Sequence, residues 1–135
     1  MARKLFVNLP VRDLKRTVDF YSALGFSFNP KFTDETATCM IIGEDNFAML
    51  LTHEKFSQFT SNPIADAQKV TQVLVALTCD SRADVDAMVE KAKAGGGRET
   101  RDAQDHGFMY SRAFADPDGH IWEPFWMDPD SVPSA

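Results

Sequence analysis

Residues Leu9–Phe26 read LPVRDLKRTVDFYSALGF, a pattern typical of a strand end, a helix and the start of another strand. Asp13 can cap the helix, and apolar residues recur at helical spacing until Gly25 ends it. An apolar strand, Leu5–Val11, is expected before the helix, and an alternating strand, Phe26–Phe32, after it. The chain therefore begins with a β-α-β unit.

Two more strands complete this unit. TCMII, residues Thr38–Ile42, and NFAMLL, residues Asn46–Leu51, flank Gly43-Glu44-Asp45, which suits a tight hairpin. The first module, β-α-β-β-β, then spans about residues 4–52. The polar segment at about residues 53–69 is expected to be a linker with short helical turns.

The second half of the chain repeats this order. Ser81 can cap a second helix, and Gly95–Gly97 closes it. The other expected strands are Val70–Asp80, Arg98–Asp102, Phe108–Ala115 and His120–Trp126. This internal duplication predicts an α+β fold in a single domain, residues 1–135, with a second βαβββ module at about 70–127 and a frayed tail at 128–135.

Composition excludes several classes of partner. The net charge is −6 and no cluster of Lys and Arg breaks that balance, which argues against nucleic-acid binding. No apolar run approaches the roughly 20 residues that span a bilayer, and the N-terminus lacks the features of a signal peptide. Cys39 and Cys79 lack metal-ligand spacing and are expected to be free thiols of a cytoplasmic protein.

Aligning the two modules relates four positions. The first strands match at an offset of 68, which places Phe6 on Leu74, and the last hairpins at an offset of 73, which places Leu50 on Glu123. Two modules side by side would bring these four positions around one concavity. Of the four, Glu123 alone is polar.

Two motifs carry a family resemblance. LPVRDLKRTVDFYSALGF and ADPDGHIWE, residues Ala115–Glu123, resemble the vicinal oxygen chelate superfamily. This group contains glyoxalase I-like lyases, extradiol dioxygenases, fosfomycin resistance enzymes and bleomycin resistance proteins. The resemblance implies that the two βαβββ modules form a cupped mixed sheet that binds a small molecule, usually within a homodimer.

The resemblance also implies a metal position that this chain does not complete. Glu123 falls where metal-dependent members carry their last ligand, but the related positions are Phe6, Leu50 and Leu74. A divalent site needs three or four O, N or S ligands. No cofactor is therefore expected, unless a non-standard divalent site joins Glu123 to a residue such as His106.

The surroundings of Glu123 leave several roles open. Strand alternation places Ile121, Glu123 and Phe125 on one face of their strand, and Trp122 and Trp126 on the other. A carboxylate in apolar surroundings must be solvated, paired, metal-bound or neutral. Glu123 is then either a structural ion-pair partner, or a ligand acceptor and general acid or base. If nothing compensates it, the neutral acid is favoured, and Glu123→Gln should keep or improve stability at neutral pH.

The remaining candidates surround the same concavity. Asn8 and Gln72 share strand parity with Phe6 and Leu74, and Phe125 shares parity with Glu123, so these side chains are candidate ligand contacts. Equally, Asn8 and Gln72 can lie near strand ends and meet solvent.

Tyr110 and Arg112 share one strand face, where they can bind an anionic ligand or lie at a subunit boundary. His106 is a second acid/base candidate in a loop, or a solvated histidine. Trp122 and Trp126, taken as an exposed face, favour a homodimer.

These observations predict a small-molecule-binding protein without the complete standard metal site. Whether it is an enzyme stays open. The first alternative is a metal-dependent enzyme, lactoylglutathione lyase-like or dioxygenase-like, with non-standard ligands. The second alternative is an interaction module that kept the fold and lost the pocket.

Overall fold

The computed structural model of the protein describes residues 3–131. These residues form two compact units, unit 1 up to Asp66 and unit 2 from Ala67 onward. Each unit contains one four-stranded mixed sheet and one long helix in the order β-α-β-β-β, so the predicted α+β class and the internal duplication are confirmed. Of the tail predicted to fray, residues 132–135 lie outside the described residues.

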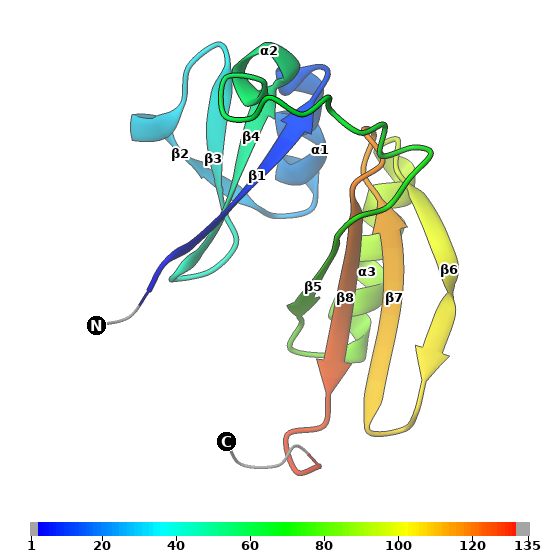
Figure 1. The fold of residues 1–135 in the computed structure, drawn as a ribbon. Helices are drawn as coiled ribbons and strands as arrows, with labels where there is room; N and C mark the ends of the chain where they lie inside the picture. The colour runs from blue at the N-terminus through cyan, green and yellow to red at the C-terminus, as the bar shows by residue number, and fades with distance from the viewer. Residues whose placement is uncertain (1–2, 132–135) are drawn as a thin grey trace. The chain divides into compact units, whose positions relative to one another are not determined.

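Unit 1 has the strand order β1-β4-β3-β2, in which β1 is parallel to β4 (Figure 1). Its elements are β1 (Leu5–Val11), α1 (Leu14–Ala23), β2 (Ser27–Asn29), the 3-10 turn η1 (Pro30–Phe32), β3 (Ala37–Ile41), β4 (Asn46–Thr52) and the short helix α2 (His53–Phe56). Helix α1 begins where predicted, because the side chain of Asp13 accepts a hydrogen bond from the backbone N–H of Arg16 at 3.1 Å.

One strand of unit 1 is shorter than its sequence pattern suggested. The predicted strand Phe26–Phe32 ends at Asn29, and η1 follows. Pro30 has no N–H to donate to a ladder, and the side chain of Asn29 accepts from the backbone N–H of Lys31 at 3.0 Å. The local turn therefore replaces the second half of the strand.

Unit 2 has the strand order β5-β8-β7-β6, with β5 parallel to β8. Its elements are β5 (Leu74–Thr78), α3 (Arg82–Ala94), β6 (Arg98–Asp105), β7 (Met109–Ala115) and β8 (Ile121–Met127). Ser81 caps α3 by accepting from the N–H of Asp84, and Gly95 caps its C-terminus, as the sequence predicted. Strand β5 is shorter than the predicted Val70–Asp80, and β6 is longer than the predicted Arg98–Asp102.

Helix α3 covers one face of the unit 2 sheet, and the core of the unit lies between the helix and that face (Figure 1). Val85 and Val89 on the helix are buried, as are Phe114 on β7 and Trp122 on β8. Trp122 is only 1% exposed, so the prediction of an exposed tryptophan face is wrong for this residue. Its strand parity was correct, but that face packs against the helix rather than meeting solvent.

The turn between β7 and β8 is held by its first aspartate. Asp116 is buried, and its side chain accepts from the backbone N–H groups of Asp118 at 3.0 Å and His120 at 2.9 Å. Gly119 adopts a φ of +99°, which L side chains rarely adopt. This geometry fixes where β8 begins, and therefore which of its residues face the helix.

No helix in the described part of the chain is long and apolar enough to cross a membrane.

Candidate functional site

The face of the unit 2 sheet opposite α3 is called here the open face. Ile121, Glu123 and Phe125 of β8 lie on it, half-buried, while the alternate residues Trp122 and Pro124 are buried on the other side. On the neighbouring strand β5, the exposed residues Leu74, Ala76 and Thr78 pair in register with them. The structure thus places Leu74, Glu123 and Phe125 on one face, which strand alternation had predicted for Glu123 and Phe125.

Glu123 has a cationic partner on this face. Nη2 of Arg101 lies 3.3 Å from Oε2 of Glu123, and the same atom donates to the Ser111 hydroxyl at 3.2 Å. The side chains of Arg101 and Glu123 are 28% and 24% exposed, so ligand can reach both. The carboxylate of Glu123 is therefore paired within its own sheet.

Arg101 was not among the residues predicted from sequence. Strand β6 reads RETRDAQD, which lacks the alternation that would assign its side chains to faces. The β6–β7 register shifts on both sides of Arg101, between Glu99 and Arg101 and again between Arg101 and Gln104. Such irregularities re-aim side chains, and no sequence signal located them in advance.

Tyr110 and Arg112 lie on the helix side of the same sheet and bind carboxylates there. Arg112 contacts Asp86, Glu90 and Glu99 at 2.7–2.9 Å. Tyr110 donates to Asp86 at 2.6 Å. The pKa of Asp86 is lowered, first by the hydrogen bond from Tyr110 and then by the hydrogen bond from Arg112. The pKa of Arg112 is raised by its hydrogen bonds to Glu99, Glu90 and Asp86. Both side chains therefore connect the sheet to α3.

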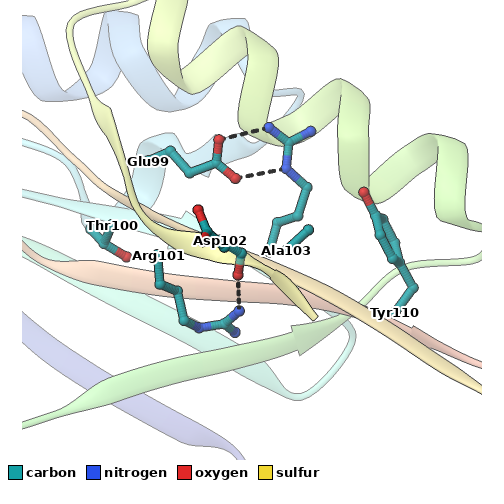
Figure 2. A pocket seen from close by; sticks show the side chains of 7 residues that line it. Glu99, Thr100, Arg101, Asp102, Ala103 and Tyr110 are labelled. Carbon is teal, nitrogen blue, oxygen red and sulfur yellow. Dashed lines mark hydrogen bonds and ion pairs between the residues drawn. The ribbon is translucent and has the colours of Figure 1, made fainter. Parts of the chain in front are cut away.

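A pocket of about 550 Å³ lies beside this cluster, and Figure 2 shows the side chains that line it. Glu99 and Tyr110 extend toward the helix, whereas Arg101 leaves its strand on the opposite side. The lining residues are Glu99, Thr100, Arg101, Asp102, Ala103, Tyr110 and Arg112. Because three carboxylates already occupy the guanidinium of Arg112, this pocket is poorly suited to an anionic ligand.

In unit 1 the predicted site residues divide between two faces. The exposed Phe6 stacks on Phe47 with ring centroids 4.7 Å apart, and Asn8 is exposed on the same strand face. Leu50 is instead fully buried beside Leu9. It cannot contact a ligand on the face that carries Phe6.

The position of Leu50 corrects the alignment of the two modules. The hairpin pairs Ile41↔Phe47 and Ala115↔Ile121 are equivalent and lie 74 residues apart. The predicted offset of 73 was one residue short, and a slip of one residue moves a side chain to the other face. Met49, not Leu50, is the unit 1 equivalent of Glu123.

Gln72 and His106 both lie outside the strands that flank Glu123. Gln72 is exposed in a bend before β5. His106 is exposed at the β6–β7 turn, where its N–H bonds to the carbonyl of Met109, and Met109 pairs with Met127. Met127 lies four strand residues beyond Glu123, about 13 Å along β8. The structure therefore does not join His106 to Glu123.

The residues present do not fit a metal ion. Among residues 3–131, no three His, Cys, Asp or Glu side chains are grouped as a metal site requires. Corrected for register, the positions related to Glu123 are Phe6, Met49 and Leu74, and none offers a hard oxygen or nitrogen ligand. Glu123 is instead paired with a guanidinium.

Comparisons with solved structures find the same fold. The hypothetical protein SA1046 from S. aureus is 25% identical with a TM-score of 0.79, and the match covers 93% of this chain and 94% of that one. A glyoxalase/bleomycin resistance protein/dioxygenase family enzyme from Burkholderia phytofirmans PsJN is 18% identical, with a TM-score of 0.76 and coverage of 93% and 99%.

A bleomycin resistance determinant encoded on the transposon Tn5 is 21% identical, with a TM-score of 0.64 and coverage of 94% and 99%. No curated protein matches this chain. The family model described as Glyoxalase/Bleomycin resistance protein/Dioxygenase superfamily matches residues 5–123, which span the first module and the second as far as Glu123 in β8. The chain therefore belongs to the Glyoxalase/Bleomycin resistance protein/Dioxygenase superfamily.

Proposed function

We propose that this protein binds a small, partly apolar molecule on the open face of unit 2 without using a metal ion. The observation that carries the proposal is a polar cluster beside an apolar row on the same face, in which Arg101 and Glu123 are half-buried and Ser111 is buried. Ligand sites commonly combine an apolar lining with a few placed polar groups.

The apolar row supplies the binding area. Leu74 is 53% exposed, and the half-buried Ile121 and Phe125 lie on the adjacent strand. Burying apolar surface contributes roughly 25 cal/mol per Å². In the proposed complex these side chains hold the body of the ligand, while the polar cluster fixes its orientation.

We also propose that the protein is a homodimer in the cytoplasm. Strands β1 and β5 are edge strands, and each exposes apolar side chains, among them Phe6 and Leu74. Exposed apolar edges are normally covered, and a second copy of the chain is the occupant we propose. The free cysteines Cys39 and Cys79 suit a reducing compartment.

Fragment binding followed by NMR tests the proposed site. Titrating a library of aromatic fragments into ¹⁵N-labelled protein should shift the amide signals of Leu74, Ala76 and Phe125. Ala76 is exposed next to Glu123, so Ala76→Trp should fill the face and abolish the shifts. Ala87→Trp on the exposed side of α3 is the matched control and should leave binding intact. Fragments that bind only the helix side, or bind equally well to the Ala76 variant, would overturn the proposal.

A further inference from the structure

We propose that Arg101 and Glu123 together select neutral ligands whose apolar body carries a hydrogen-bond donor beside an acceptor, as a primary amide does. This inference rests on the proposed binding function and specifies the chemical class of its ligand. Glu123 would accept from the ligand's donor, and Arg101 would donate to its acceptor. Arg101 thereby becomes a specificity residue of the site.

Glu123 retains an acceptor for a ligand. Oε2 is occupied by Arg101, whereas Oε1 has no hydrogen-bond partner among residues 3–131. The carboxylate is half-buried between Ile121 and Phe125, where a lone hydrogen bond counts for more than in water. A ligand N–H or O–H is the natural partner of this oxygen.

Arg101 retains donors. Its Nη1 donates to the carbonyl of Asp102 at 3.2 Å, and its Nη2 donates to Ser111 and Glu123. A guanidinium carries five N–H donors, so further donors remain for an acceptor atom of the ligand. The side chain is 28% exposed and can meet it.

The contact between the two residues is longer than the other guanidinium–carboxylate contacts of this sheet. At 3.3 Å it is longer than the 2.7–2.9 Å contacts that Arg112 makes on the other side of the sheet. Charge-assisted hydrogen bonds usually lie at about 2.7–2.9 Å. The Arg101–Glu123 pair is therefore not at its closest geometry.

The charge balance of the pair decides between ligand classes. Arg101 and Glu123 carry opposite charges, and the residues paired with them on the neighbouring strands, Ala113 and Ala76, are uncharged. An anionic ligand that approached Arg101 would meet the Glu123 carboxylate, and a cationic ligand that approached Glu123 would meet the guanidinium. A neutral group with adjacent donor and acceptor satisfies both residues without repulsion.

The backbone of β6 supports this role independently. Register shifts flank Arg101 on both sides, so an irregular strand presents this side chain to the open face. Irregularities of this kind are often found beside binding sites.

Three probes that share one ring system test the inference. NMR titrations with 2-naphthamide, 2-naphthoate and 2-naphthylmethylammonium give the affinity of each probe and the residues that it shifts. The amide should bind at least tenfold more tightly than either charged probe, as expected for one additional charge-assisted hydrogen bond and the absence of repulsion.

Charge-removing variants should then change the selectivity in opposite directions. Glu123→Gln leaves Arg101 uncompensated and should strengthen 2-naphthoate binding about tenfold. Arg101→Gln should strengthen 2-naphthylmethylammonium binding by a similar factor, whereas Arg101→Lys, which keeps the charge, should keep the wild-type order. Lys91→Gln, an exposed position on α3 at the other face of the sheet, is the control and should change nothing. Thermal unfolding of each variant verifies that it is folded.

The outcomes separate the two proposals. Binding on the open face without preference for the amide, or with a preference that neither Gln variant alters, overturns the inference and leaves the proposed function standing. If none of the three probes shifts open-face signals in any variant, the proposed function fails as well.

Discussion

Arg112 and Glu99 form a two-point contact, in which Nε and Nη2 of the guanidinium each lie 2.9 Å from one carboxylate oxygen. The two residues come from neighbouring strands, and the same guanidinium reaches Asp86 and Glu90 on α3. One side chain, only 12% exposed, thus ties β6 and β7 to the helix that covers the core. Arg112 is therefore a structural residue, and its replacement should lower the stability of the protein.

Arg112→Met should destabilise the protein by about 2 kcal/mol at pH 7. Removing one member of a buried ionic network costs roughly 3–5 kcal/mol, and the partial exposure of its carboxylate partners reduces that figure. Urea unfolding of this variant beside Arg98→Met, an exposed arginine on the same sheet, provides the measurement. Equal stabilities of the two variants would contradict the assigned role.

The same network predicts how stability depends on pH. Hydrogen bonds, chiefly from Tyr110 to Asp86 and from Arg112 to Glu99, lower the pKa values of both carboxyl groups. Because their folded-state pKa values are lowered, the stabilisation is present above the unfolded values, near 4, and is lost as pH falls through the folded values. The melting temperature of the wild type should fall between pH 5 and pH 2, and less steeply in Arg112→Met.

Because Glu123 pairs with Arg101, the structure predicts that Glu123→Gln lowers stability, whereas the sequence predicted no loss. A carboxylate without a partner would be replaced by Gln at no cost, but Glu123 has a cationic partner at 3.3 Å. The variant should therefore lose about 0.5–1 kcal/mol at pH 7, the usual value for a partly exposed pair. A double-mutant cycle with Arg101→Gln measures the coupling energy between the two side chains. A coupling energy of zero would mean that the ion pair does not cause the loss of stability.

Local sequence patterns predicted most of this fold. The element order, the Ser81 cap and the parity of β8 follow from residue types and strand alternation. What failed depended on contacts between distant segments. Leu50 was misplaced because the register of two hairpins had to be guessed, and Trp122 because parity does not reveal what covers a face.

The candidate site was predicted only in part for the same reason. Glu123 was recognisable as a lone acid in an apolar row, but its partner Arg101 lies 22 residues earlier on an irregular strand. No periodic pattern assigns side chains of such a strand to a face. The pairing becomes visible only when the sheet is assembled.

We expect no stoichiometric transition metal in the purified protein. The positions related to Glu123 are apolar or thioether side chains, and the carboxylate itself binds Arg101. Elemental analysis of protein purified without an affinity tag should give far less than one metal per chain. Close to one equivalent of Zn, Ni, Mn or Fe, lost in Glu123→Gln, would instead support the metal-dependent enzyme.

The proposed dimer predicts how exposed apolar residues respond to substitution. Phe6→Ser and Leu74→Ser alter the two edge strands, β1 and β5, and should shift the equilibrium toward monomer. Phe32→Ser is the control, since this exposed residue follows β2 at the opposite end of its sheet from β1. Sedimentation at micromolar concentration measures the effect. A wild-type species of only about 15 kDa would exclude the dimer.

Gly119 and Gly96 form a matched pair for testing the packing around the β7–β8 turn. Both have positive φ values, +99° and +104°, which cost any L residue about 1–2 kcal/mol. A Cβ at Gly96 would meet nothing within 4 Å, whereas one at Gly119 would lie 2.6 Å from the backbone carbon of Ala67. The second position therefore adds a backbone clash to the same conformational strain.

Gly96→Ala should lower stability by about 1 kcal/mol, and Gly119→Ala by roughly 3 kcal/mol or more. The clash would push residues 67–68 away from the turn, where Gln68 Nε2 also donates to the carbonyl of Pro117 at 2.8 Å. Denaturant unfolding compares the two variants, and the amide signals of the turn report its displacement. Equal losses of stability in both variants would mean that residues 67–68 move aside with little loss of free energy. These residues would then not hold the turn that precedes β8.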